Sequence, residues 1–171
     1  MVARPSTTRA STGTTARPAA TTSTTRAATS GQLTYQTLLG KALTDPAIVA
    51  YLNNNRCESN GSSSYLCRSA GTFVTFGGSD RRVVRVRMYA GADGVTAYTG
   101  ALPRGLTWSD TRAAVERKIG SPQTLRPGVA TSPPVFAVAI YSGPTMEITY
   151  QWTDGPPPPD AKMFRLEIAS T

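Results

Sequence analysis

The stretch RRVVRVRMYA, residues 81–90, alternates apolar and basic side chains. Because successive side chains of a strand point to opposite faces, this pattern predicts a half-buried antiparallel strand. Its core face would carry Val84, Val86 and Met88, and its solvent face Arg85 and Arg87. The strand is therefore expected to lie in a sheet with one face against the core and arginines on the other.

Four other stretches have strand-like composition and end at turn residues. They are SYLCRSAGTFVTFGG (64–78), PVFAVAIYS (134–142), TMEITYQWTD (145–154) and AKMFRLEIAS (161–170). Gly143 and Pro144 separate the second from the third, and Gly155 with four prolines separates the third from the fourth. These breaks favour antiparallel strands joined by short turns.

Helix signals precede the strands. In residues 33–55, Asp45 followed by Pro46 predicts a helix start, because aspartate caps helices and proline suits the first turn. The apolar face of this helix is predicted to comprise Ile48, Val49, Tyr51 and Leu52, and its end to lie at residues 53–55. Together with the leucines before Thr44, the pattern predicts two short helices in a hairpin.

The stretch LPRGLTWSDTRAAVERKIGSP, residues 102–122, predicts another short helix. Ser109 or Thr111 can cap it, and Val115 and Ile119 share one face. Gly120 suits a left-handed helix end, and Pro122 prevents continuation. The expected anchors are Leu102, Leu106 and Trp108, and the expected exposed side carries Arg104, Asp110 and Glu116.

This order of signals predicts an α+β fold. Helical segments followed by strands occur twice, which favours two helix-plus-antiparallel-sheet halves at roughly 31–100 and 101–171 and suggests a tandem repeat. Residue identity between the halves is low. The predicted organisation is a single domain over 31–171.

Residues 1–30 differ in composition from the rest. They are almost entirely Thr, Ala, Ser, Arg and Pro, without an acidic or aromatic residue. Such a segment has too little apolar surface to offset the entropy of ordering it, so a disordered basic tail is expected. It has no apolar run typical of a secretory signal or a membrane span, which favours a cytoplasmic location. Organellar import, export by another route, an assembly arm and an inert extension stay open.

Charge and residue usage limit the functions. The chain has 18 Lys and Arg against 10 Asp and Glu, a formal net charge of +8, and no histidine. The usual general base and the commonest metal ligand are therefore missing. No phosphate-binding glycine motif is present either. We expect a protein without catalytic activity, cofactor or metal.

Cys57 and Cys67 enclose nine residues rich in Ser, Gly and Asn. A loop of this length permits a disulfide, whereas in a reducing cytosol the two residues would be free thiols. Both states are open from the sequence.

A group of side chains is suited to binding a partner. Arg81, Arg82, Arg85 and Arg87 form the densest charge cluster after residue 30, and they fit either a solvated strand face or a patch for an acidic protein or phosphate. Tyrosine and tryptophan are enriched in interfaces, although they also fill cores. The candidate partner-binding residues are Arg85, Arg87, Tyr89, Tyr98, Trp108 and Trp152.

Residues 33–169 resemble a group of bacterial proteins with a Tyr-x-Gly-x-Leu-Pro-x-Gly-Leu segment, a helix and Gly-x-Pro. The matches are Tyr89, Tyr98, Gly100, Leu102, Pro103, Gly105, Leu106, Arg112, Val115, Gly120 and Pro122. Ala114 stands where the group often has an acidic residue. More distantly, helix-then-strands halves around CESNGSSSYLC (57–67) resemble the β-lactamase inhibitory protein and small lipoproteins of outer-membrane assembly. This resemblance implies a protein that binds proteins and catalyses nothing.

The expected function is therefore a protein-binding module of inhibitor or immunity type. One alternative is a structural subunit of a larger assembly, anchored by the basic arm. Another is nucleic-acid binding through the arginine strand.

Overall fold

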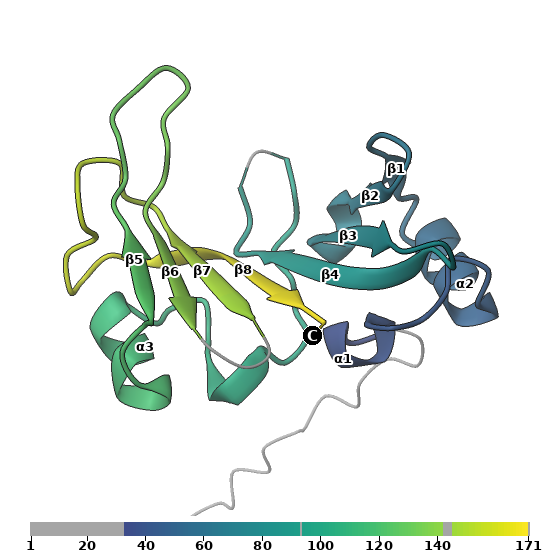
Figure 1. Cartoon of the computed structure of the whole chain (residues 1–171), viewed down its shortest axis with the longest axis horizontal. Coiled ribbons are helices and arrows are strands. Elements are labelled where there is room, and N and C mark those ends of the chain that lie inside the picture. The colour runs from purple at the N-terminus through teal and green to yellow at the C-terminus, as the bar shows by residue number, and fades with distance from the viewer. Residues whose placement is uncertain (1–32, 93, 142–144, 171) are drawn as a thin grey trace, which may run out of the picture.

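The computed structural model describes residues 33–92, 94–141 and 145–170 (Figure 1). The predicted tail, residues 1–30, lies outside these ranges. The helices are α1 (Tyr35–Leu38), α2 (Pro46–Asn54) and α3 (Arg112–Ile119), with short 3-10 turns η1 (Arg68–Ala70) and η2 (Pro103–Gly105). The strands are β1 (Glu58–Ser59), β2 (Ser64–Cys67), β3 (Thr72–Gly77), β4 (Arg82–Tyr89), β5 (Thr124–Arg126), β6 (Val138–Tyr141), β7 (Met146–Tyr150) and β8 (Met163–Ala169).

All eight strands form one antiparallel sheet in the order β1-β2-β3-β4-β8-β7-β6-β5. Strands β1 to β4 pair with their neighbours in sequence, and so do β5 to β8. The β4–β8 pair joins the two runs in the centre of the sheet. The fold is α+β, as the order of sequence signals predicted.

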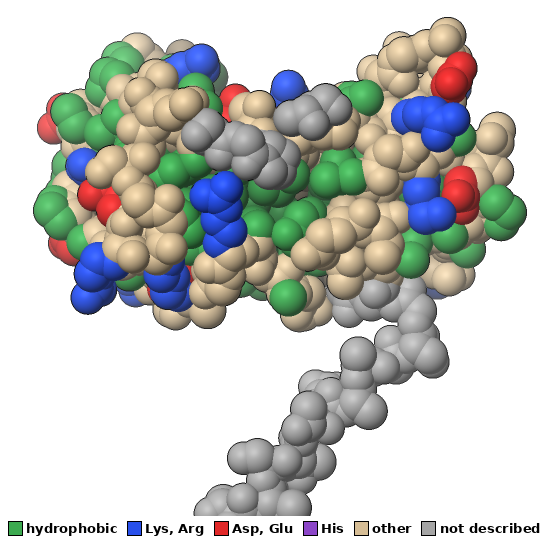
Figure 2. Space-filling model, turned by 60° about the horizontal axis from the view of Figure 1, so that its bottom comes forward, with side chains coloured by type: hydrophobic (Ala, Val, Ile, Leu, Met, Phe, Trp, Pro, Cys, Tyr) green, Lys and Arg blue, Asp and Glu red, His purple; other side chains and the backbone are tan. Residues whose placement is uncertain are grey.

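The helices cover one face of the sheet, which is the lower side in Figure 1. The β5–β6 connection and the chain after β4 rise on the upper side. On the helical side, hydrophobic side chains gather near the middle of the surface beside a basic side chain, and most of the other charged side chains lie towards the two ends (Figure 2). A hollow of about 180 Å³ lies there and is lined by Tyr35, Pro103, Arg104, Met146 and Ile168. The sheet residues at this hollow, Met146 and Ile168, are 3% and 2% exposed, so the helical side keeps the centre of the sheet buried.

Helix α2 begins as the sequence predicted. The Asp45 side chain accepts a hydrogen bond from the Ala47 N–H at 2.8 Å, and Pro46 opens the first turn. Ile48 and Tyr51 are buried, but Val49 is 43% exposed. The predicted face was therefore too wide, because only residues three or four apart point in the same direction on a helix.

Strand β4 departs from strict alternation near its start. The β3–β4 register shifts between Thr75 and Phe76, so Phe76 pairs with Val83. Val83, Val86 and Met88 are fully buried, whereas Val84 is only partly buried. The prediction that Val84 faces the core was wrong, because a bulge reverses the side-chain alternation before it.

The segment 102–122 packs against the sheet through Leu106 and Val115, which are 4% and 0% exposed. Thr111 rather than Ser109 is the N-cap of α3, and its side chain accepts a hydrogen bond from the Ala114 N–H. Gly120 ends the helix at φ +87°, a conformation that side chains disfavour.

The structure corrects the placement of Asp110, which the sequence pattern put on the exposed side. Asp110 is 8% exposed and pairs with Lys118 at 2.7 Å. It also accepts a hydrogen bond from the Thr107 N–H at 2.8 Å. Burial raises the pKa of Asp110, but the hydrogen bonds from Lys118 and Thr107 outweigh it and hold this pKa below its usual value. Asp110 is therefore an ionised brace between the turn before α3 and the helix.

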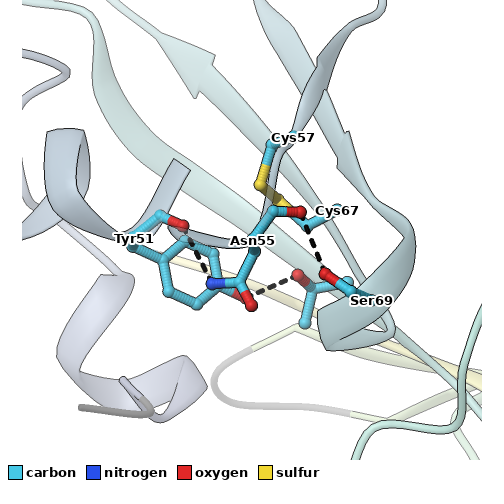
Figure 3. Close-up of a disulfide and its surroundings, with 6 residues drawn as sticks. Tyr51, Asn55, Cys57, Cys67 and Ser69 are labelled. Atoms are coloured by element: carbon cyan, nitrogen blue, oxygen red, sulfur yellow. Dashed lines mark hydrogen bonds between the residues drawn. A yellow bond between two sulfur atoms is a disulfide. The ribbon is translucent and has the colours of Figure 1, made fainter. Parts of the chain in front are cut away.

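The disulfide Cys57–Cys67 links the chain after α2 to the end of β2 (Figure 3). Three hydrogen bonds surround it. The Ser69 hydroxyl donates to the Asn55 carbonyl at 2.9 Å, the Asn55 side chain donates to the Tyr51 carbonyl at 2.8 Å, and the Tyr51 and Thr72 hydroxyls lie 2.6 Å apart. Burial raises the pKa of Tyr51 to about 12, so its hydroxyl keeps its proton. The bridge and these bonds attach α2 to the sheet.

Val115→Ala tests whether α3 depends on its buried face. We expect a loss of about 1–3 kcal/mol in the free energy of unfolding, because the substitution removes buried methyl groups and leaves a cavity. Chemical denaturation measures it. Arg117→Ala, on the exposed side of the same helix, is the control and should change stability by less than about 0.5 kcal/mol. Equal losses for the two variants would contradict the packing of α3.

Asp110→Asn tests the buried brace. At neutral pH we expect a loss of about 1–2 kcal/mol, because the Lys118 ammonium loses its ionic partner. Since the folded-state pKa lies below the ordinary value of 3.8, this contribution is complete above that pH and disappears as the pH falls through the folded-state pKa. Urea denaturation at a series of pH values measures it. A difference between wild type and variant that stays constant down to the acid limit would refute the ionic role.

Reduction of the disulfide should destabilise the domain. Because the bridge limits the conformations of the unfolded chain, we expect a loss of about 2–3 kcal/mol for the reduced protein and for the Cys57→Ser, Cys67→Ser double variant. Denaturation with and without reductant gives the measurement. The double variant should not respond to reductant, and unchanged wild-type stability on reduction would show that the bridge contributes nothing.

Candidate functional site

The face of the sheet opposite the helices carries the candidate site, and we call it the open face. Cross-strand partners point to the same side of an antiparallel sheet, so the strand registers define its residues. Its central row runs from β2 to β6 through Leu66, Phe73, Arg87, Glu167, Glu147 and Ile140. A second row contains Tyr89, Arg165, Thr149 and Val138. The open face thus combines arginines, two glutamates and aromatic rings.

Glu167 is the electrostatic centre of the open face. Its side chain is only 8% exposed and binds two arginines, Arg85 at 3.0 Å and Arg87 at 2.7 Å. The Arg87 guanidinium also lies 5.3 Å above the centre of the Phe73 ring. Burial disfavours the charge of Arg87, but Glu167 and Tyr89 together outweigh this effect and raise the pKa of Arg87. One carboxylate therefore holds two permanent cations in fixed positions.

A hollow of about 350 Å³ lies at the Tyr89 end of the open face. We call it the Tyr89 hollow, and its lining includes Leu66, Arg68, Tyr89, Phe136, Phe164 and Arg165. These residues come from β2, η1, β4, β8 and the chain before β6. Segments far apart in the sequence thus meet at this one place.

Two aromatic side chains form part of its wall. Phe136 and Phe164 are in edge-to-face contact, with ring centres 4.9 Å apart. Phe164 occupies an irregular position in β8, since Thr149 pairs with Arg165 but Tyr150 pairs with Met163. This register shift is the reason why Phe164 and Arg165 can both line the hollow.

Arg165 is the partly buried cation of the hollow. Its side chain donates to the Thr149 hydroxyl at 3.1 Å and lies 5.9 Å above the Phe164 ring. Burial, and next the charge of Arg87, lower the pKa of Arg165. Within residues 33–92, 94–141 and 145–170, no carboxylate lies within the 4.0 Å ion-pair distance of its guanidinium. Arg165 is therefore held in place by neutral groups.

The connection between β5 and β6 flanks the open face and carries exposed apolar side chains. Val129 and Val135 face each other across it, with both backbone N–H groups donating to the opposite carbonyl. Their exposed fractions are 49% and 53%, and nearby Trp152 is 37% exposed. Trp152 is adjacent because its carbonyl accepts from the Ala137 N–H at 2.8 Å. Exposed apolar residues that cluster in this way are typical of contact surfaces.

The residues predicted to bind a partner occupy three environments. Arg85, Arg87 and Tyr89 lie on the open face, as the strand pattern indicated. Tyr98 lies in the core instead, 3% exposed, with its hydroxyl 3.4 Å from the Tyr35 N–H. The remaining two are tryptophans: Trp108 donates to the Tyr98 carbonyl and packs against the core, and Trp152 lies beside the β5–β6 connection.

Sequence reasoning missed Glu167, Arg165, Phe136 and Phe164. The stretch AKMFRLEIAS contains a weak signal, because Glu167 stands between Leu166 and Ile168, and a glutamate between apolar residues of a buried strand needs a partner. The identity of that partner depends on which strand lies next to β8, and this neighbour is 80 residues away in the chain. The signal could therefore indicate a buried ion pair but not locate it.

Two further findings describe the rest of the molecule. In the part of the chain that the structure describes, no group of three or more Asp, Glu or Cys side chains is arranged to hold a metal ion. Among the same residues, none of the helices is long and apolar enough to cross a membrane. The open face combines charged side chains, aromatic rings and a hollow.

Comparison of the chain with protein-family models, with curated proteins and with solved structures gives no significant match. The resemblance described from the sequence accordingly rests on its motif residues alone.

Proposed function

We propose that this domain is a non-enzymatic protein-binding module of inhibitor or immunity type, whose open face covers an acidic patch of a partner protein. The observation that carries the proposal is the arginine array on the sheet face opposite the helices. Arg85, Arg87 and Arg165 project from adjacent strands, while the helices occupy the opposite side.

The charge distribution supports an acidic partner. Arg85 is 49% exposed even though it pairs with Glu167, so it keeps free donors for an outside carboxylate. The chain as a whole has a formal net charge of +8, which steers acidic molecules towards it. Nucleic acid is a weaker fit, because a continuous row of phosphates would have to pass over Glu147 and Glu167. The carboxylates of a protein patch are separate from one another and can contact the arginines alone.

Apolar groups support a protein rather than a small ion as the partner. Interfaces combine aromatic and arginine anchors with a polar rim. The open face supplies Phe73, Tyr89 and the Tyr89 hollow, and the β5–β6 connection supplies Val129 and Val135 at its border. A partner that covers the face and contacts this connection would bury both kinds of group.

We also propose that the two runs of strands with their helices are tandem halves. The support is the order of strands in the sheet. Outwards from the central β4–β8 pair, one side has β4, β3, β2 and β1, and the other side has β8, β7, β6 and β5. Under this proposal the open face spans both halves, and Glu167 of the second half neutralises arginines of the first.

Arg85→Gln is the test of the proposed surface. The protein is used to capture binding partners from extracts and secreted fractions of the source organism, and the captured protein is purified for calorimetry. We expect Arg85→Gln to weaken binding about tenfold, because it removes one cation from the contact without unfolding the domain. Affinity should also fall as salt is raised, because salt screens the contributing charges.

Arg117→Gln is the matched control, because Arg117 is exposed on the helical side. It should bind like the wild type. The proposal fails if no protein is retained, or if every retained protein binds both variants equally. Circular dichroism and thermal melting confirm that both variants are folded.

A further inference from the structure

We propose that the Tyr89 hollow is the anchor site of the open face and accepts an aromatic side chain with a carboxylate beside it, as in a Phe-Asp or Tyr-Glu pair on an exposed loop of the partner. This inference rests on the proposed function, since it names the chemistry that the open face recognises.

The size of the hollow suits one large side chain and its neighbour. At about 350 Å³ it lies near the lower end of the range of ligand pockets, about 300–1,000 Å³. Its lining comes from β2, η1, β4, β8 and the chain before β6, together with Ala92 and Val95 of the chain after β4, and the hollow is present in the structure without a partner. Preformed pockets of this kind hold the aromatic anchors of protein interfaces.

The wall of the hollow favours an aromatic occupant. Phe136 and Phe164 already meet edge to face, with an interplanar angle of 62°, and Tyr89 and Leu66 lie on the same lining. A further ring can pack against such a cluster in offset or edge-to-face geometry, which contributes beyond the buried area alone. A purely aliphatic side chain would lack this contribution.

Arg165 favours a carboxylate next to that ring. The guanidinium has five N–H donors, and the Thr149 hydroxyl takes the bond from its Nε. The centre of the guanidinium lies 5.9 Å from the centre of the Phe164 ring, and its terminal NH₂ groups suit a two-pronged bond to a carboxylate. Burial and Arg87 depress its pKa, so an incoming negative charge would relieve an existing electrostatic cost.

Arg68 supplies a second cation at the same hollow. It pairs with Glu58 at 3.4 Å, but both side chains are well exposed, at 48% and 62%. Exposed pairs of this kind contribute at most about 1 kcal/mol, so Arg68 can exchange Glu58 for a partner carboxylate. The hollow thus offers one fixed and one movable cation around an aromatic wall.

The test uses blocked tetrapeptides and the full chain labelled with ¹⁵N. The probes are acetyl-Gly-Phe-Asp-Gly-amide, its Phe-Asn and Ala-Asp counterparts, and adenosine monophosphate, each titrated by NMR. We expect the Phe-Asp peptide to shift the amide signals of Tyr89, Val95 and Phe164. The Phe-Asn and Ala-Asp peptides should bind about tenfold more weakly, since each lacks one of the two recognised groups.

Variants of the hollow separate recognition of the carboxylate from recognition of the aromatic ring. Arg165→Gln should reduce the preference for the Phe-Asp over the Phe-Asn peptide, and the Arg68→Gln, Arg165→Gln double variant should abolish it. Phe136→Ala should reduce the preference for the Phe-Asp over the Ala-Asp peptide, because Phe164 and Tyr89 remain on the wall. Arg117→Gln, far from the hollow on the helical side, should retain both preferences. If one site variant fails to fold, the other still tests its half of the recognition.

Equal binding of the Phe-Asp and Phe-Asn peptides by the wild type, shifts confined to other regions, or no shifts at all would overturn the inference. Tighter binding of adenosine monophosphate would do so as well, and would instead indicate a nucleotide. Binding of a captured partner protein to the variants distinguishes failure of the anchor site from failure of the proposed function. Loss of its binding in Arg85→Gln but not in Arg165→Gln overturns only the anchor site, whereas loss in neither variant overturns both.

Discussion

The pairing of β4 with β8 is the constraint on which the rest of the structure depends. It is the only strand pair within the described sheet that joins residues 58–89 to residues 124–169. On its core side, Val86 pairs with Ile168 and Met88 with Leu166, and all four side chains are 2% exposed or less. Without this pair, each run of four strands would have an unpaired edge and an exposed apolar face.

The same pairing creates the candidate site on the other side of the sheet. In the register that aligns the buried residues, Arg87 lies opposite Glu167 and Tyr89 lies opposite Arg165. A shift by one residue would turn every side chain to the other face and bury these charges. Core packing therefore holds the charged groups in place, and the ion pairs on the open face add to the specificity of the register.

Irregularities in the strands account for the less regular parts of the site. The shift in β3–β4 pairing leaves Val84 outside the core, and the shift in β7–β8 pairing lets Phe164 and Arg165 both line the hollow. Gly71 contributes in another way, because its φ of +68° ends η1 and a side chain there would collide with the backbone at Thr96 and Tyr98. The chain after β4 can therefore closely approach the turn that leads from η1 into β3.

Local signals in the sequence determined the α+β class, most of the long strands, the start of α2 at Asp45 and Pro46, and the position of α3. These features depend on periodicity and on caps, which involve residues within about four positions of each other. Only the tertiary structure decided that Asp110 and Tyr98 are buried and that several distant segments form the Tyr89 hollow. It also decided that Cys57 and Cys67 form a disulfide, where the sequence had left free thiols equally open. Arg87 and Glu167 are 80 positions apart, so their ion pair exists only because β4 and β8 are neighbours in the sheet. Periodicity shows which face of a strand is buried, but the choice of neighbouring strand comes from packing of the whole core.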